Sequence, residues 1–228
     1  MPKKNKKQQA IAAAYRRLKK INSQLMAYAP RPVCERLAKT GVAEQLEGHS
    51  RQSHVCVLFT DIRGFTELSR VLDNQGLLSM VQRSSARQSE LVQANGGYVD
   101  NYTGDGLMAI FEGENKVQNA CECAVALIAL VSKSRVGGKP LTVAVGVHVG
   151  PVLMGNLGSS ELRSYTAIGE TVNVAAKLCD HARLPEVIAS NAVRVALSES
   201  DCMTFEPLPA AMIPGIEAHM PVYRLSRC

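Results

Sequence analysis

The chain has 228 residues, 46% of them hydrophobic and 20% charged, which is the composition of an ordinary globular protein and excludes a disordered or fibrous chain. No run approaches the roughly 18 consecutive apolar residues of a membrane span, and the basic N-terminus lacks the apolar core of a secretory signal. The seven cysteines form no Cys-x-x-Cys pair, so neither a disulfide framework nor a zinc knuckle is indicated. We therefore expect a cytoplasmic protein.

The net charge of +6 is concentrated in the N-terminal tail. Residues 1–34 hold nine of the 26 Lys and Arg residues and no acidic residue. Residues 35–228 hold the other 17 basic residues and all 20 acidic residues. A nucleic-acid-binding domain would spread basic residues over a folded face and add aromatic side chains for stacking, but this chain has no Trp and 4% aromatics. No nucleic-acid partner is expected, whereas contact of the tail with an anionic membrane surface stays open.

Residues 1–50 are predicted to be a basic N-terminal helical segment. Apolar residues recur there at two complementary seven-residue offsets, which are Ile11, Leu18 and Leu25, and Ala14, Ile21 and Tyr28. This a/d seam predicts a short parallel coiled coil. Three heptads are marginal for an isolated helix pair, so an amphipathic helix packed on its own domain is the alternative. Pro30 and Pro32 should end the helix, and another short helix should begin near Val33.

From residue 54 onward, predicted strands and helices alternate. Strands are expected at 55–59, 98–102, 107–111, 141–149, 165–168, 187–189, 204–206 and 222–225, and helices at 66–95 with a break near Asp73, 115–134 and 170–182. The opening order β-α-β-β-α-β predicts an α+β fold with a ferredoxin-like core, extra strands and helices, and the N-terminal helical extension. Such a core predicts an antiparallel sheet with helices on one face. A glycine-rich segment at 150–158 separates two of the strands.

Two acids follow predicted strands that should be neighbours. Asp61 follows the apolar run VCVLF, and Asp105 lies in the turn Thr103-Gly104-Asp105-Gly106 between two strands. In a ferredoxin-like sheet their carboxylates could hold a pair of Mg²⁺ ions about 3.5–4 Å apart. The alternative is a pair of solvated turn acids, since Asp is common in such turns.

Two further features favour a phosphate-binding site. Gly64-Phe65-Thr66 places a flexible residue at the start of a helix, where backbone N–H groups attract anionic phosphate. Asn173 and Lys177 are four residues apart on a predicted helix, so a neutral donor and a cation project from one face. Together with the two acids, these groups suit a nucleoside triphosphate.

Four segments then carry a resemblance to a known family. VLFTDIRGFTEL at 57–68, YVDNYTGDGLMAIF at 98–111, VGVHVGPVLMGNLG at 145–158 and SYTAIGETVNVAAKL at 164–178 resemble, in order and spacing, the class III adenylate and guanylate cyclase catalytic domain of the bacterial type. The resemblance covers residues 54–226. Residues 27–46 also resemble the short helical segment that precedes this domain.

The resemblance implies a head-to-tail homodimer whose active sites are shared between the chains. In one protomer Asp61, the Ile62 carbonyl and Asp105 would hold two Mg²⁺ ions, with Mn²⁺ as a substitute, and the loop at Gly64, Phe65 and Thr66 would face the triphosphate. The partner would contribute the remaining residues, in which Asn101 and Thr166 read the base, Asn173 orients the ribose and Lys177 stabilises the transition state. The ribose 3′-hydroxyl of ATP would then attack the α-phosphorus and expel pyrophosphate.

Three positions depart from the family pattern. Asn101 stands where adenylate cyclases have a base-reading lysine, Lys177 replaces an arginine and lacks its bidentate fork, and Pro214 stands where a phosphate-binding lysine is expected. Thr166 can accept from the adenine amino group while the Asn101 amide donates to the ring, but both groups can also reverse their roles and serve guanine. We therefore expect preference for ATP with measurable use of GTP. A guanylate cyclase and a catalytically weak regulatory dimerisation domain remain alternatives.

Overall fold

The computed structural model describes residues 2–40, 50–159, 161–183, 185–197, 203–209 and 220–227. The chain divides into two compact units, Met1–Gly48 and His49–Cys228. None of the helices in the described ranges is long and apolar enough to cross a membrane. Pro214 lies outside the described residues.

The N-terminal unit consists of helices. Helix α1 (Pro2–Leu25) covers the predicted seam except Tyr28, which lies in the 3₁₀ turn η1 (Met26–Tyr28) that follows, and α2 (Arg31–Thr40) begins near the position expected from the two prolines. Three seam side chains of α1 are more than half exposed, namely Ile11, Leu18 and Leu25. Both the coiled coil and the alternative of a helix packed on its own domain stay predictions.

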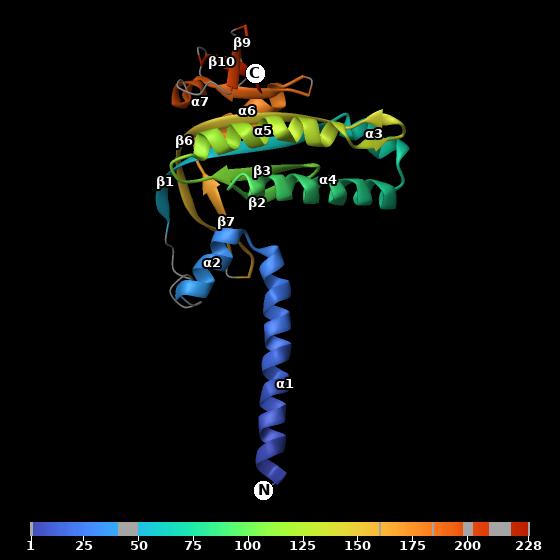
Figure 1. Ribbon diagram of the computed structural model, residues 1–228, viewed down its shortest axis with the longest axis vertical. Coiled ribbons are helices and arrows are strands. Elements are labelled where there is room, and N and C mark those ends of the chain that lie inside the picture. The colour runs from blue at the N-terminus through green and yellow to red at the C-terminus, as the bar shows by residue number, and fades with distance from the viewer. Residues whose placement is uncertain are drawn as a thin grey trace. The chain divides into compact units, whose positions relative to one another are not determined.

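The second unit is built on one large sheet with the strand order β2-β3-β1-β6-β8-β10-β9, visible in Figure 1. Its strands are β1 (Arg51–Arg63), β2 (Tyr98–Thr103), β3 (Gly106–Phe111), β6 (Thr142–Gly158), β8 (Val187–Ser190), β9 (Met203–Pro207) and β10 (Val222–Arg227). Long apolar β-branched runs explain the central strands, which are buried on both faces. The predicted α+β fold with a ferredoxin-like core is confirmed.

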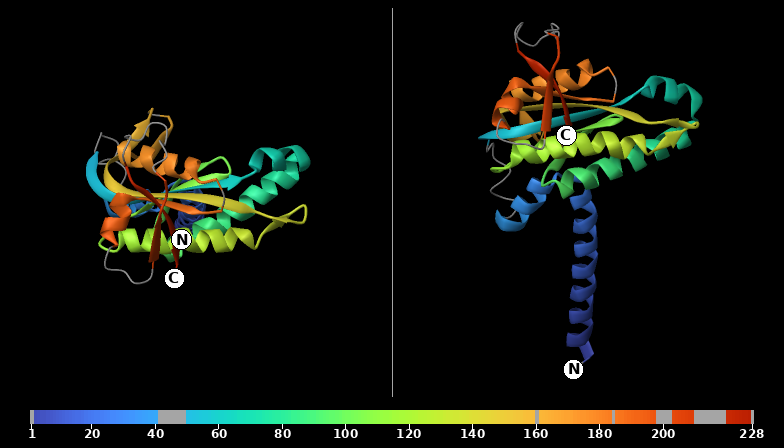
Figure 2. Two further views of the ribbon diagram at one scale, coloured as in Figure 1. Left: turned by 90° about the horizontal axis from the view of Figure 1, so that it is seen from above. Right: turned by 45° about the horizontal axis from the view of Figure 1, so that its top comes forward.

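Helices cover both faces of this sheet, which corrects the expectation of one covered face. Helices α4 (Asn74–Ala94) and α5 (Lys116–Ser132) pack on the face formed by residues such as Leu58 and Val145. Helix α6 (Glu170–His181) packs on the opposite face, against Ala144 and Ile188, as the view from above in Figure 2 shows. The sheet is also mixed, because β6 and β8 run parallel while its other pairings are antiparallel.

The glycine-rich segment 150–158 is part of strand β6, which corrects the predicted end of that strand at residue 149. Its first half pairs with β1, and its second half pairs with β7 (Arg163–Ile168) as a two-stranded arm.

The sequence prediction also missed three short elements, which are the hairpin of β4 (Arg135–Val136) with β5 (Lys139–Pro140) and the helix α7 (Asn191–Ala196). Helix α3 (Phe65–Val71) is separated from α4 at the predicted break, where Asp73 caps α4 by accepting from the Gly76 amide.

Candidate active site

The two predicted metal-binding acids lie side by side at the end of adjacent strands. Strand β1 pairs with β3 so that Thr60 is opposite Leu107, which brings Asp61 next to the β2–β3 turn that carries Asp105. The Ile62 amide donates to Asp105 Oδ2 over 3.2 Å, and the Leu107 amide donates to Thr60 Oγ1 over 3.0 Å. These two hydrogen bonds therefore hold the β2–β3 turn against β1 next to both carboxylates.

Electrostatics at this pair favour a bound cation. Partial burial raises the pKa of Asp61 and of Asp105, and the charge of Asp61 raises the pKa of Asp105 further. Arg63 lowers the pKa of Asp61 through an ion pair of 2.9 Å and also donates to the Cys179 carbonyl. Two adjacent carboxylates that repel each other are hard oxygen ligands of the kind Mg²⁺ prefers, so the donor set fits the expected ions. No group of three or more His, Cys, Asp or Glu suited to a metal occurs among the described residues, so the Ile62 carbonyl and substrate phosphates would have to complete such a site.

The predicted phosphate loop follows directly. Gly64 adopts φ 76°, in the left-handed region that favours glycine, and turns β1 into α3. The first hydrogen bonds into this helix are donated by the Glu67 and Leu68 amides to the Gly64 carbonyl. The amides of Phe65 and Thr66 precede those bonds, beside Asp61 in sequence, as a phosphate-facing role requires.

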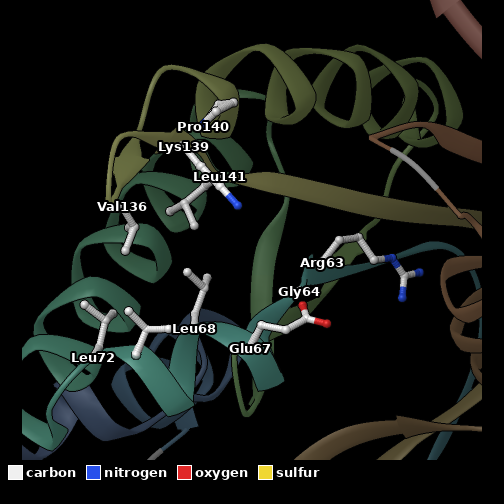
Figure 3. Close-up of a pocket in the computed structure, with 11 residues that line it drawn as sticks. Arg63, Gly64, Glu67, Leu68, Leu72, Val136, Lys139, Pro140 and Leu141 are labelled. Atoms are coloured by element: carbon white, nitrogen blue, oxygen red, sulfur yellow. The ribbon is translucent and has the colours of Figure 1, made fainter.

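A pocket of about 380 Å³ lies between α3 and the β4–β5 hairpin. Figure 3 shows Leu68, Leu72, Val136 and Leu141 gathered around it, with Arg63 at its edge. Neither Asp61 nor Asp105 lines this pocket.

The two residues predicted to act on the ribose and the transition state lie on α6. Asn173 is exposed and Lys177 half-buried, and both project from the helix that packs on the β6 face. The C-terminal end of α6 lies close to the acids, because Arg63 links Asp61 to the Cys179 carbonyl.

The strands that carry the two predicted base readers, β2 and β7, contact each other. Asn101 is exposed on β2, and Thr166 is 9% exposed on β7. Thr166 Oγ1 donates to Asp100 Oδ2 over 2.5 Å, so the residue preceding Asn101 fixes Thr166. The sequence prediction missed Asp100, because a charged residue within a strand gives no signal that it is buried.

Asn101 and Asp61 share one face of the sheet. Asn101 is opposite Met108, and Met108 is opposite Phe59, so all three side chains point to the face on which Phe59 packs with the α6 cluster. Asp61 follows Phe59 by two residues and therefore points to the same face. One face of a single chain thus presents Asp61, Asn101 and α6.

Comparison with known proteins agrees with this arrangement. The adenylate and guanylate cyclase catalytic domain matches residues 48–226, and the chain therefore belongs to this family. Adenylate cyclase 1 of Rhizobium meliloti is 31% identical in an alignment of 185 residues that covers 76% of this chain and 28% of that protein. An adenylate cyclase of Anabaena cylindrica is 25% identical over 76% of this chain and 36% of that protein. The chain thus spans about a third of the length of these relatives.

Solved structures show the same fold. A bacterial light-regulated adenylyl cyclase superposes with a TM-score of 0.83 at 25% identity, over 95% of this chain and 64% of that one. The adenylyl cyclase CyaB from P. aeruginosa gives 0.71 at 22% identity, over 78% of this chain and 95% of that one. The guanylate cyclase domain of RhGC from Catenaria anguillulae, in complex with GTP, gives 0.72 at 18% identity, over 78% and 98%. The fold is therefore shared by cyclases for either purine.

Proposed function

We propose that this chain is the catalytic part of an adenylate cyclase that converts ATP into 3′,5′-cyclic AMP and pyrophosphate at a homodimer interface. The observation that carries the proposal is the pair Asp61 and Asp105, held together on adjacent strands and followed at once by the amides of Phe65 and Thr66. This combination of hard oxygen ligands and backbone donors suits a metal-bound triphosphate.

Each group has a distinct task in the proposed reaction. Asp61, Asp105 and the Ile62 carbonyl would hold two Mg²⁺ ions, or Mn²⁺ in their place, which supply activation of the ribose 3′-oxygen and stabilisation of the leaving phosphates. The Phe65 and Thr66 amides bind the triphosphate. From the partner, Asn173 orients the ribose and Lys177 offsets the negative charge that develops as the 3′-oxygen attacks the α-phosphorus. The Lys177 ammonium acts as a point charge, because it lacks the bidentate hydrogen-bonding geometry of an arginine guanidinium.

Exposed apolar side chains on the β6–β7 arm support a shared site. Leu153, Leu157 and Ile168 are 44%, 56% and 46% exposed, and the pairing of Leu153 with Ile168 puts them on one face of the arm. Thr166 is opposite Gly155 on that same face. An apolar patch beside a base reader is typical of a surface that a second chain covers, and a second copy would bring its own carboxylates to this base reader.

The substrate preference tests the proposed function. Purified protein incubated with Mg²⁺ or Mn²⁺ and either nucleotide should form cyclic AMP faster than cyclic GMP, with the products identified by mass. Measurable GTP use is expected because Asn101 stands in place of a lysine. A lysine can only donate a hydrogen bond, whereas the Asn101 amide can rotate to donate or to accept one. Equal or faster formation of cyclic GMP would overturn the adenylate assignment in favour of a guanylate cyclase.

Mixing two inactive variants tests the shared site. Asp61→Ala and Asn173→Ala disable different halves of each composite site, so a mixed dimer has one site with all its residues. Co-expression should restore up to about a quarter of wild-type activity if the chains pair at random. Asp61→Ala mixed with Asp105→Ala is the matched control and should stay inactive, because both changes affect the same half. If a verified mixed dimer of Asp61→Ala with Asn173→Ala forms no cyclic AMP, the shared site is excluded.

A further inference from the structure

The buried hydrogen bond between Asp100 and Thr166 has a fixed direction. Thr166 Oγ1 is 2.5 Å from Asp100 Oδ2, whereas the nearest competing acceptor, the Ala167 carbonyl, is 3.5 Å away. A threonine hydroxyl has one proton and two lone pairs, and an ionised carboxylate only accepts. Because the proton is directed to Asp100, Thr166 can offer a bound base only a lone pair.

The backbone places Asp100 where this contact forms. The β2–β3 pairing shifts register between Val99 and Asn101, so Asp100 is the extra residue of a β-bulge. Bulges redirect side chains and are common beside active sites. Here the bulge puts Asp100 into the junction with β7 while Asn101, its neighbour, remains exposed.

Keeping a carboxylate at this position costs free energy. Asp100 is 5% exposed, and its Oδ1 has no hydrogen-bond partner among the described residues. Burial raises the pKa of Asp100 to about 6, against the opposing effect of the Thr166 hydrogen bond. A buried, half-satisfied acceptor of this kind calls for an explanation in function.

We propose that Asp100 is a positioning residue that fixes Thr166 as a hydrogen-bond acceptor and thereby selects adenine over guanine. This inference rests on the proposed function, since it takes Thr166 as a base reader. The adenine amino group can donate to Thr166. The guanine carbonyl at the same ring position would instead set its lone pairs against those of Thr166 and near the Asp100 carboxylate. The sequence alone left Thr166 free to donate to guanine, and the Asp100 contact removes that freedom.

A double-mutant cycle tests the proposal. Asp100→Asn keeps the side-chain shape but supplies an amide that can donate to Thr166, and Thr166→Val removes the hydroxyl. Each single change should lower the ratio of kcat/KM for ATP to that for GTP about tenfold, the size of one hydrogen bond. The double variant should lower it no further, because Asp100 acts only through Thr166. Glu206→Gln, an exposed acid-to-amide change in an ion pair with Arg224 on the β9–β10 strands, is the control and should leave the ratio unchanged.

The contrary outcomes are distinct. Equal losses with ATP and GTP in Asp100→Asn, or changes in the ratio that add in the double variant, would overturn the positioning role. Absence of any cyclic product from the wild type would overturn the proposed function instead, and the selectivity would then be read as the ratio of dissociation constants for 3′-deoxy-ATP and 3′-deoxy-GTP, which cannot cyclise. Should Asp100→Asn fail to fold, an unchanged ratio in Thr166→Val would by itself refute the inference.

Discussion

Replacing Asp61 or Asp105 by asparagine is expected to lower cyclic AMP formation at least about 100-fold, because each change removes one of two carboxylates from a site that has to hold two cations. The protein should remain folded. Both side chains are partly exposed, the mutual repulsion of the acids disappears, and the exposed part of the Asp61–Arg63 ion pair contributes at most about 1 kcal/mol. Activity, melting temperature and Mn²⁺ binding by calorimetry are the measurements.

The Mn²⁺ titration separates a metal ligand from a residue that matters for another reason. Both variants should bind Mn²⁺ more weakly than the wild type, while the exposed-acid control Glu206→Gln should bind it normally. Retention of more than a few per cent of activity in either variant would refute the assignment of these acids as metal ligands. Lost activity with unaltered Mn²⁺ affinity would refute it equally.

The features that follow from local sequence were predictable. Asp61 stands after an apolar run and Asp105 in a glycine-bounded turn, so their neighbouring positions followed once the strand order was assigned, and the pairing of Thr60 with Leu107 confirms it. The fold class was likewise readable, because alternation of strand and helix patterns is a short-range property. The roles proposed for these acids remain to be measured.

Features that depend on pairing register were not predictable. The bulge that buries Asp100 exists only relative to β3, and the strand pattern around it is that of any half-exposed strand. The continuation of β6 through 150–158 depends on β1 and then β7 as its partners, and this pairing overrides the low strand propensity of three glycines. The packing of α6 on the second face could not be predicted from its own amphipathic pattern, which indicates that one side is buried but not against which face.

One glycine explains how α6 comes to lie on that face. A Cβ at Gly146 would overlap the Ala175 carbonyl oxygen and the Cys179 amide nitrogen, and it would lie 2.9 Å from Cys179 Cα. The backbone of α6 therefore rests directly on β6 at this point. Cys179 adds two bonds there, since its thiol donates to the Ala144 carbonyl over 3.5 Å and its own carbonyl accepts from Arg63.

Gly146→Ala should therefore displace α6 and loosen the contact that connects it to Asp61. We expect the free energy of unfolding to fall by about 3 kcal/mol, the upper range for overpacking where backbone cannot yield, which lowers the melting temperature by roughly 6–12 °C for a chain of this size. Activity at a temperature where the variant is folded should also fall, because α6 carries Asn173 and Lys177. Gly155→Ala on the same strand is the matched control, since a Cβ there meets only Ser50 atoms at 3.5 and 3.7 Å, and its melting temperature should stay within about 3 °C of the wild type. Equal melting temperatures for the two variants would show that α6 yields to the added methyl group, and the rigid contact inferred between α6 and β6 would have to be abandoned.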